Sequence, residues 1–543
     1  MNGESKDAQP SAWSPLRQPL FRALWIAAVA SNIGTLMQNV GAAWLMTALA
    51  ASPLMVALVQ TATTLPVFLL GLPAGALADV VDRRRLLLFT QWWMVAAAGV
   101  LGMLTLMNAT TSWALLSLTF LLGLGNALNG PAWQAIISDL VSREDLPSAV
   151  ALNSVGFNLA RAVGPMLGGF LVAAAGSGVV FLLNAASFLG VITVLFYWRR
   201  PPRKSVLPTE RVMGAIRIGV RYIRHVPALR GTLLQAGIFS FFATALLALL
   251  PLLARTELGL GSDGYGALLG AFGAGAIIGA AVLSKVRKKI STTQIVRVTT
   301  ILFALVVLAV AYLRSFPAIC GVMIIGGFSW LMILSVFNAS IQISVPAWVR
   351  GRALSFYLLI FFGGMAGGGA LWGMMAEFAG IPDTLLTTSV GLIAGLFLTG
   401  GRLLTTEGTD ITPSLHWPEH TMAIMPEPDS GPVLVMLEYR IDPGRGRDFA
   451  DAMRALGRMR RRDGAMRWGL FQDTADPSRY FEIFATESWA EHLRQHERVT
   501  IADREIENYV RSFHVGGTPP TTSHLIYSYG SDAKKAIDFP GPF

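Results

Sequence analysis

The sequence predicts an all-α polytopic membrane bundle of about twelve transmembrane helices in two six-helix repeats, followed by a small soluble α+β domain. Of the 543 residues, 53% are hydrophobic and only 14% are charged, which differs strongly from the composition of soluble globular proteins. The apolar residues are concentrated in segments whose length is close to the roughly 20 residues that cross a bilayer. From about residue 407 onward the chain is charged and holds no such segment.

The apolar segments form two groups of six, separated by a basic gap. The first six spans are expected at 21–48, 54–78, 86–107, 113–140, 147–175 and 179–198. The second six are expected at 233–254, 264–284, 295–313, 318–345, 353–378 and 385–404. The predicted parts are a cytoplasmic tail (1–20), the first repeat (21–198), a cytoplasmic linker (199–232), the second repeat (233–405), a linker (406–431), a cytoplasmic domain (432–530) and a tail (531–543).

The two groups of spans share residues at constant offsets, as internal repeats do. The matching positions are Gly75 with Gly279, Arg83 with Arg287, Asn129 with Asn338 and Arg143 with Arg352. These matches favour a duplicated bundle over twelve unrelated helices.

Positive charge is distributed unevenly among the loops. With the N-terminus taken as cytoplasmic, the loops on that side hold clusters such as residues 83–85, whereas the opposite loops hold only Arg255 and Arg314. The positive-inside rule then places both termini in the cytoplasm of a multi-pass protein of a bacterial inner membrane. A net charge of +10 located in these loops indicates a lipid bilayer and no nucleic-acid partner. We expect no removable signal peptide, and the single cysteine, Cys320, allows no disulfide.

Two segments outside the spans have patterns of their own. In the basic gap, apolar residues alternate with arginines over 212–223, which predicts an amphipathic helix on the anionic leaflet. After residue 432 the pattern predicts a strand, a helix, a hairpin, a second helix and a last strand. Their expected ranges are 433–441, 444–462, 466–472 with 480–486, 489–513 and 522–529. This βαββαβ order is ferredoxin-like.

Two motifs resemble signatures of the major facilitator superfamily of transporters. Gly75 to Asp79 followed by Arg83 and Arg84 resembles the signature loop Gly-x-Leu-Ala-Asp-x-x-x-Arg-Arg, with Val80 in place of the usual Arg and Asp82 in place of the usual Gly. In the fifth span, a second stretch resembles the Gly-Pro-x-x-Gly-Gly signature of the family's drug and proton antiporters. Its residues are Gly164, Pro165, Gly168 and Gly169, and Ala160 replaces the preceding glycine.

Further polar and aromatic residues resemble the branch that includes bacterial siderophore exporters. They lie between Asn32 and Trp44 and between Asn129 and Gln134. The resemblance covers about residues 15–405. It implies conformational roles for Gly75, Arg83 and Arg84 and for the glycine-proline stretch of the fifth span. It also implies that Asp79 is a gating charge, which pairs across the bundle in one conformation only.

Arg161 is the first candidate for transport, because it lies near mid-depth of the fifth span. A charge there costs about 2.5 to 3.5 kcal/mol on insertion scales, so it should face a cavity or a structural hydrogen bond inside the bundle. Other spans carry one-sided polar residues that would converge on a central small-molecule site in a repeat-built transporter. The predicted cavity residues are Asn32, Asn39, Asn126, Asn129, Trp133, Asn158, Arg161, Asn338 and Gln342. Each of them also suits a packing hydrogen bond.

Asp139 is the best carboxylate for coupling transport to protons, since it lies one turn from the cytoplasmic end of the fourth span. A simple charge at a helix end explains it equally well. No Asp or Glu lies at mid-depth, so the coupling ion stays open.

The C-terminal domain resembles the dimeric α+β barrels of the antibiotic-biosynthesis monooxygenase type, through its element order and through Trp489, His492 and His496. The resemblance implies a regulatory or dimerising module, and a homodimer through this domain. His492 and His496 have a spacing that can hold a metal, but the order is not His-Glu-x-x-His, and we expect a solvated helix face. No catalytic residue, metal site or cofactor is predicted.

These features predict a secondary active transporter and not an enzyme. The resemblance implies export of a small amphipathic metabolite, siderophore or drug by alternating access, in exchange for protons. A phosphate-binding Gly-x-x-x-x-Gly-Lys-Ser/Thr loop is absent from the sequence, which argues against an ATP-driven pump. Two alternatives stay open. One is an importer of a small solute, and the other is a membrane-tethered oxygenase or ligand sensor that acts through the C-terminal domain.

Overall fold

A computed structural model describes residues 13–50, 52–142, 144–198, 212–399, 412, 414 and 426–527, with the backbone alone at 76, 78–80, 138, 212–218, 228 and 347. The chain divides into two compact units. The larger comprises residues 1–212, 232–339 and 355–403, and the smaller comprises 213–231, 340–354 and 404–543. Of the predicted linkers, 199–211 and most of 406–431 lie outside the described residues.

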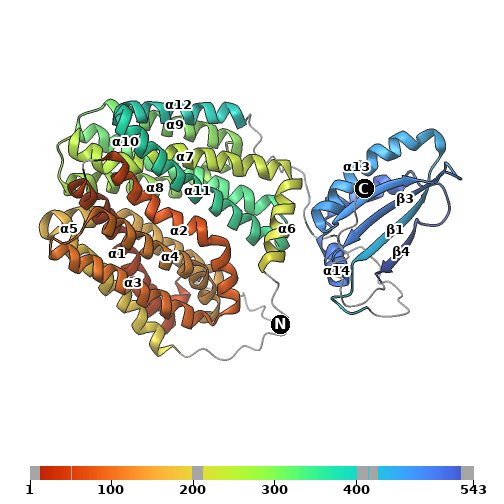
Figure 1. The fold of residues 1–543 in the computed structure, drawn as a ribbon, viewed down its shortest axis with the longest axis horizontal. Helices are drawn as coiled ribbons and strands as arrows, with labels where there is room; N and C mark the ends of the chain where they lie inside the picture. The colour runs from red at the N-terminus through yellow and green to blue at the C-terminus, as the bar shows by residue number, and fades with distance from the viewer. Residues whose placement is uncertain are drawn as a thin grey trace, which may run out of the picture. The chain divides into compact units, whose positions relative to one another are not determined.

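The first part of the chain is helical almost throughout (Figure 1). A short 3-10 turn, η1 (Ser14–Arg17), precedes α1 (Pro19–Leu49), α2 (Pro53–Val80), α3 (Arg83–Leu106), α4 (Ser112–Leu140) and α5 (Leu146–Tyr197), here called the N-half. After α6 (Val212–His225) come α7 (Pro227–Thr256), α8 (Ser262–Arg287), α9 (Thr292–Tyr312), α10 (Phe316–Ser344), α11 (Ala347–Ala379) and α12 (Ile381–Thr399), here called the C-half. Among the described residues, eleven helices are long and apolar enough to cross a membrane.

Local signals fix where these helices begin. Ser52 caps α2 by accepting a bond from the Met55 amide, and Asp82 caps α3 by accepting from the Arg85 amide at 2.9 Å. Ser291 and Gln294 form a capping box at the start of α9. Such caps satisfy amides that have no partner inside the helix.

α5 folds back on itself at Gly176. A straight helix of its 52 residues would be about 78 Å long, well over twice the hydrocarbon thickness of a bilayer. Gly176 has φ +82° and ψ 163°, a conformation that is rare for residues with a Cβ. Before Gly176, α5 runs along α1 in one direction, with Gly156 against Trp25 and Gly164 against Leu36. After Gly176 it runs back in the other direction, with residue 181 against Gly41 and residue 184 against Gly34.

Each segment of α5, 146–175 and 177–197, is therefore long enough to cross the bilayer by itself. The bundle end near this turn is called the Gly176 end below, and the opposite one, where α2 gives way to α3, the Asp82 end.

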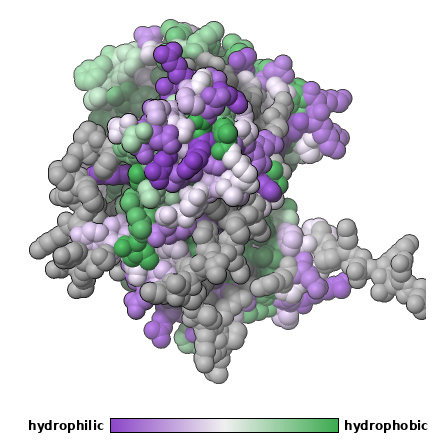
Figure 2. All heavy atoms as spheres, turned by 90° about the vertical axis from the view of Figure 1, so that its right-hand side faces the viewer, coloured by the Kyte–Doolittle hydropathy of each residue, from purple (hydrophilic) through white to green (hydrophobic). Residues whose placement is uncertain are grey.

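The C-terminal domain contains one antiparallel sheet with the strand order β2-β3-β1-β4. Its elements are β1 (Val433–Arg440), η2 (Pro443–Arg445), α13 (Gly446–Asp463), β2 (Arg467–Gln472), β3 (Arg479–Thr486), α14 (Trp489–Arg498), α15 (Ile501–Arg511) and β4 (Thr521–Ile526). The register pairs Val435 with Phe484 and with His524. On the face of this domain that Figure 2 shows, hydrophilic residues predominate.

The helix predicted at 489–513 is in fact two helices, which corrects the sequence-based expectation. α14 ends at Arg498 and α15 begins after Thr500, whose hydroxyl accepts from the Asp503 amide while the Asp503 carboxylate accepts from Thr500. This capping box starts a new helix, and the spacing Thr-x-x-Asp was visible in the sequence.

A buried charge network holds the helices of this domain against the sheet. Arg460 is 3% exposed; its Nε lies 3.2 Å from Glu482, and its Nη1 lies 2.9 Å from Glu507. Trp468 and Tyr439 also donate to Glu482, at 3.0 and 3.3 Å. Although burial opposes its charge, the two carboxylates raise the pKa of Arg460. Removal of any one member would leave a buried polar group of this network without its partner.

Replacing Arg460 by alanine should destabilise the C-terminal domain by about 3 to 5 kcal/mol, because two buried carboxylates lose their cation. Hydrogen exchange of β1 and β3 in the full-length protein measures this as lost protection. Arg454→Ala is the matched control, since the Arg454 side chain is 74% exposed and pairs only at the surface with Asp451. Equal protection in both variants would show that the network contributes little to stability.

Candidate transport site

Arg161 lies midway between the start of α5 and its turn at Gly176. The side chain is half-buried, and its guanidinium carbon lies 5.0 Å from the centre of the Phe157 ring, one turn earlier on the same helix. Among the described residues, no carboxylate pairs with it. A cation at this depth without an acidic partner can attract a negative or strongly polar group of a ligand.

Polar side chains from three helices of the N-half lie at a similar depth. Asn32 and Asn126 are near the middle of α1 and α4, and Asn158 precedes Arg161 on α5 by three residues. Asn126 is exposed, Asn32 and Asn158 are half-buried, and the Asn158 amide donates to the Ser154 carbonyl at 3.0 Å. Asn39 is also exposed, closer to the Gly176 end.

Asn129 and Trp133 take part in packing inside the N-half. The Asn129 side-chain oxygen accepts from Thr90 at 3.2 Å and from Gln91 at 3.3 Å, which joins α4 to α3. The Trp133 indole donates to Asn153 at 3.4 Å and joins α4 to α5. Their role at a cavity stays a prediction.

The two predicted residues of α10 belong to different units. Asn338 lies in the larger unit and is half-buried, whereas Gln342, one turn later, lies in the smaller unit and is exposed. Both remain predicted cavity residues.

The N-half and the C-half contact each other from the Gly176 end to mid-depth. At the end itself, Arg255 donates to the Thr47 hydroxyl at 3.1 Å, and Ser52 donates to Glu377 at 2.9 Å. Trp44 stacks on Tyr265 with ring centres 6.0 Å apart. At mid-depth Thr61 donates to the carbonyl of residue 366 at 2.9 Å. These contacts close the Gly176 end in this conformation.

The glycines predicted to be conformational residues lie where α5 meets its neighbours. A Cβ on Gly164 would lie 2.9 Å from Leu36, and one on Gly168 would lie 2.8 Å from the Met37 Cα, both on α1. One on Gly169 would lie 2.5 Å from the Ser262 carbonyl oxygen and 2.6 Å from the Gly266 Cα, both on α8. Pro165 is buried in the same stretch. Only glycine allows so close an approach of backbones.

The charges of the signature loop bind within the N-half. Arg83 lies 3.2 Å from Asp139, whose side chain is 5% exposed, and it also donates to the residue 135 carbonyl. Arg84 donates to the carbonyls of residues 195 and 196 at the end of α5, at 2.8 and 2.7 Å. Gly75 is half-buried on α2, and the side chain of Asp79 lies outside the described residues. Arg83 thus joins α3 to α4, and Arg84 joins α3 to α5.

Two internal features were not identified in the sequence analysis above. Gln38 and Asn184 are both buried and hydrogen-bond each other, which joins α1 to the second segment of α5. Trp330 of α10 is 6% exposed and lies among four phenylalanines. These are Phe239, Phe272, Phe303 and Phe361, with ring centres 5.6 to 6.1 Å away. Trp330 therefore packs inside the C-half.

Three histidines of the C-terminal domain form an aromatic cluster. The ring of His492 lies 4.5 Å from that of His496 and 4.8 Å from that of His524, and Trp489 packs beside them. His492 is 1% exposed, so the solvated helix face expected there is wrong for this residue. Among the described residues, no group of His, Cys, Asp and Glu is arranged to hold a metal.

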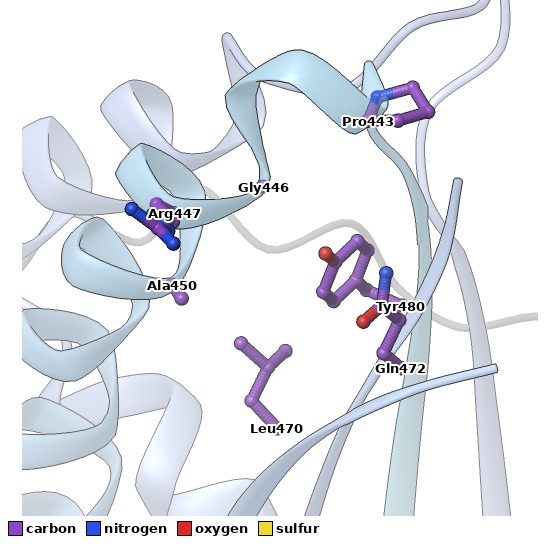
Figure 3. Close-up of a pocket in the computed structure, with 7 residues that line it drawn as sticks. All are labelled: Pro443, Gly446, Arg447, Ala450, Leu470, Gln472 and Tyr480. Carbon is purple, nitrogen blue, oxygen red and sulfur yellow. The ribbon is translucent and has the colours of Figure 1, made fainter. Parts of the chain in front are cut away.

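A shallow groove of about 380 Å³ lies elsewhere on this domain (Figure 3). Gly446, Arg447 and Ala450 of α13 line one side, and Leu470, Gln472 and Tyr480 of the sheet line the other, with Pro443 at its edge. The residues that line this groove do not include a nucleophile paired with a general base.

The family described as transmembrane secretion effectors, of the major facilitator type, matches residues 10–531. The chain is similar to the multidrug efflux pump Tap of Mycolicibacterium fortuitum, with 28% identity over 69% of this chain and 94% of that protein. It is similar to the enterobactin exporter EntS of Salmonella paratyphi A, with 27% identity over 70% of this chain and 91% of that protein.

Solved transporters share the fold of the bundle. A bacterial homologue of the human lysosomal transporter Spinster, in an inward-facing and unoccupied conformation, superposes with a TM-score of 0.57 at 17% identity over 72% of this chain and 98% of its own. A POT family transporter in complex with 5-aminolevulinic acid gives a TM-score of 0.58 at 13% identity over 70% and 94%.

Proposed function

Because this chain belongs to the transmembrane secretion effector family of major facilitator transporters, we propose that it is a secondary active exporter of a small amphipathic metabolite, siderophore or drug. The observation that carries the proposal is Arg161, a half-buried cation at mid-depth without an acidic partner among the described residues. The exporters among its relatives support the direction of transport.

We propose that the bundle consists of twelve spans in two six-helix repeats, with both termini in the cytoplasm. The turn at Gly176 supports the count, since it divides α5 into two spans. The basic residues of the Asp82 end, such as Arg83, Arg84 and Arg287, support a cytoplasmic position for that end. In this conformation the contacts at the Gly176 end would then close the outer side, as alternating access requires of one state.

The chemistry around Arg161 supports an amphipathic substrate. The guanidinium suits a carboxylate, phenolate or other electron-rich oxygen, and the adjacent Phe157 ring, 43% exposed, suits an apolar or aromatic part. The amides of Asn126 and Asn158 add donors and acceptors at the same depth.

Accumulation of dyes, antibiotics and siderophores in expressing cells tests this function. Cells with the wild type should retain less of at least one compound than cells without it, and a protonophore should abolish the difference. Faster uptake of a compound in expressing cells would favour the importer instead.

We propose that protons drive export through Asp139. Protonation of this carboxylate would release Arg83 and loosen the contact between α3 and α4. The Asp139→Asn variant should keep the helix end intact and lower proton-driven efflux by about tenfold, since it cannot exchange a proton. Efflux along a substrate gradient, measured with the membrane potential and pH gradient collapsed, should change little. Equal losses in both assays would assign Asp139 a structural role.

We further propose that the C-terminal domain is a ferredoxin-like module that pairs with a second copy through the open face of its sheet. Apolar side chains alternate on that face, and they include Leu434, Met436, Ile483 and Leu525. Leu434 and Leu525 are exposed, and such a surface is usually covered by a partner. The mass of the detergent-solubilised protein, compared with that of Leu434→Glu, tests the dimer.

A further inference from the structure

The smaller compact unit contains more than the C-terminal domain. It also includes α6 with the start of α7, and residues 340–354, which are the end of α10 and the start of α11. Arg221 of α6 makes the first contact: its guanidinium donates to the Gly464 carbonyl at 3.2 Å and lies 3.4 Å from Glu491. Gly464 ends α13 with φ +148°, so a glycine is needed there to present this carbonyl.

An aromatic pair from α6 and α11 makes the second contact. Tyr222 of α6 and Trp348 at the start of α11 meet edge to face, with ring centres 5.6 Å apart. The guanidinium of Arg498 lies 4.7 Å from the centre of the Trp348 ring, and that of Arg462 lies 6.0 Å from that of Tyr222. Both arginines belong to the C-terminal domain, so these are cation–π contacts between it and the two helices α6 and α11 within the smaller unit.

The domain side of this contact is held by the domain's own ion pairs. Arg498 binds Glu491 at 2.6 Å, and Arg462 binds Asp463 at 2.7 Å and Asp503 at 2.6 Å. The arginine planes are therefore fixed by the domain's own fold and lose little further freedom when they meet the aromatic rings. The docking cluster is defined as Arg221, Tyr222 and Trp348 on one side and Arg462, Glu491 and Arg498 on the other.

The contact excludes water from the groups at its centre. Tyr222 is 3% exposed, and burial raises the pKa of its phenol. Burial also lowers the pKa of the Arg221 guanidinium, which Glu491 opposes. A helix lying with Tyr222 and Arg221 on a lipid surface would leave these groups hydrated, so this face of α6 meets protein.

Both docking segments belong to the C-half or lead into it. α6 runs into α7, and Trp348 lies at the start of α11. We propose that the docking cluster holds the C-terminal domain on the chain's own linker helix, α6, and on the start of α11, which together are its binding partner.

Pulsed electron spin resonance on the full-length protein tests the proposal. Spin labels on Arg230→Cys at the start of α7 and Arg454→Cys of the C-terminal domain, in a Cys320→Ser background, report one distance; both sites are exposed. A single narrow distribution is expected. Trp348→Ala and Arg221→Glu should each lower the ratio of docked to undocked protein by about tenfold and broaden the distribution.

The substitutions are made in α6 and α11 because Glu491 and Arg498 also stabilise the C-terminal domain itself. Arg224→Glu is the control; it makes the same charge change on an exposed position of α6 and should keep the narrow distribution. Hydrogen exchange of β1 and β3 checks that the domain stays folded in every variant. A broad distribution of label distances in the protein with an intact docking cluster would overturn the proposal. So would a narrow distribution that neither Trp348→Ala nor Arg221→Glu changes.

Discussion

Efflux should fall by at least about tenfold when Arg161 is replaced by alanine, because the substrate loses the cation that binds it at mid-depth. Lower amounts of protein cannot explain such a loss. Removing a charge from the bilayer centre lowers the cost of membrane insertion by about 2.5 to 3.5 kcal/mol, so the variant should insert at least as well as the wild type. The initial efflux rate per amount of protein in the membrane is the measurement.

Two further variants separate the parts of this argument. Arg161→Lys keeps the charge but loses the planar guanidinium, so it should retain efflux of anions and lose selectivity among them. Phe170→Ala is the control on the same helix, since Phe170 is 62% exposed on the surface of the bundle. Unchanged efflux in Arg161→Ala would make Arg161 a packing residue and would remove the main support for the proposed site.

Gly169→Leu should block the conformation closed at the Gly176 end and should lower efflux by about tenfold or more. Even the Cβ would lie 2.5 Å from the Ser262 carbonyl oxygen and 2.6 Å from the Gly266 Cα. Both atoms belong to backbone, so α5 and α8 must separate. The distance between labels on Met107→Cys and Ser315→Cys, which lie in exposed positions of the two halves at that end, should lengthen.

Gly99→Leu on α3 is the matched control, because no atom lies within 4 Å of a Cβ built there. It should keep both the distance and the efflux rate. If Gly169→Leu lowered efflux without changing the distance, the glycine would act on substrate passage and not on closure.

Residue patterns predicted the parts of this protein whose causes are local. Transfer of apolar side chains into lipid is nearly additive over a window of about 20 residues, so the helices were visible in composition alone. The strands of the C-terminal domain were predictable for the same reason, because apolar and polar residues alternate along a strand when one face of its sheet is buried. The break at Thr500 was missed although its capping box is local, because the apolar period continued across it.

Polar residues at mid-depth were less predictable, since their partners come from distant helices. Asn129 accepts hydrogen bonds from α3, and Gln38 pairs with Asn184, 146 residues away. Whether such a side chain faces a neighbour or a cavity depends on which helices lie side by side.

Hydrophobic length and short motifs are local properties, so residue patterns were enough to predict a membrane-embedded transporter of the major facilitator type with a folded C-terminal domain. Which end of the bundle is closed depends on contacts between distant helices, such as the approach of α5 to α8, and no residue pattern indicated it. Nor did any pattern indicate that Arg498 meets Trp348 or that Arg221 meets Glu491. These contacts join residues far apart in the chain, and their free energy depends on burial and distance, which no sequence window contains.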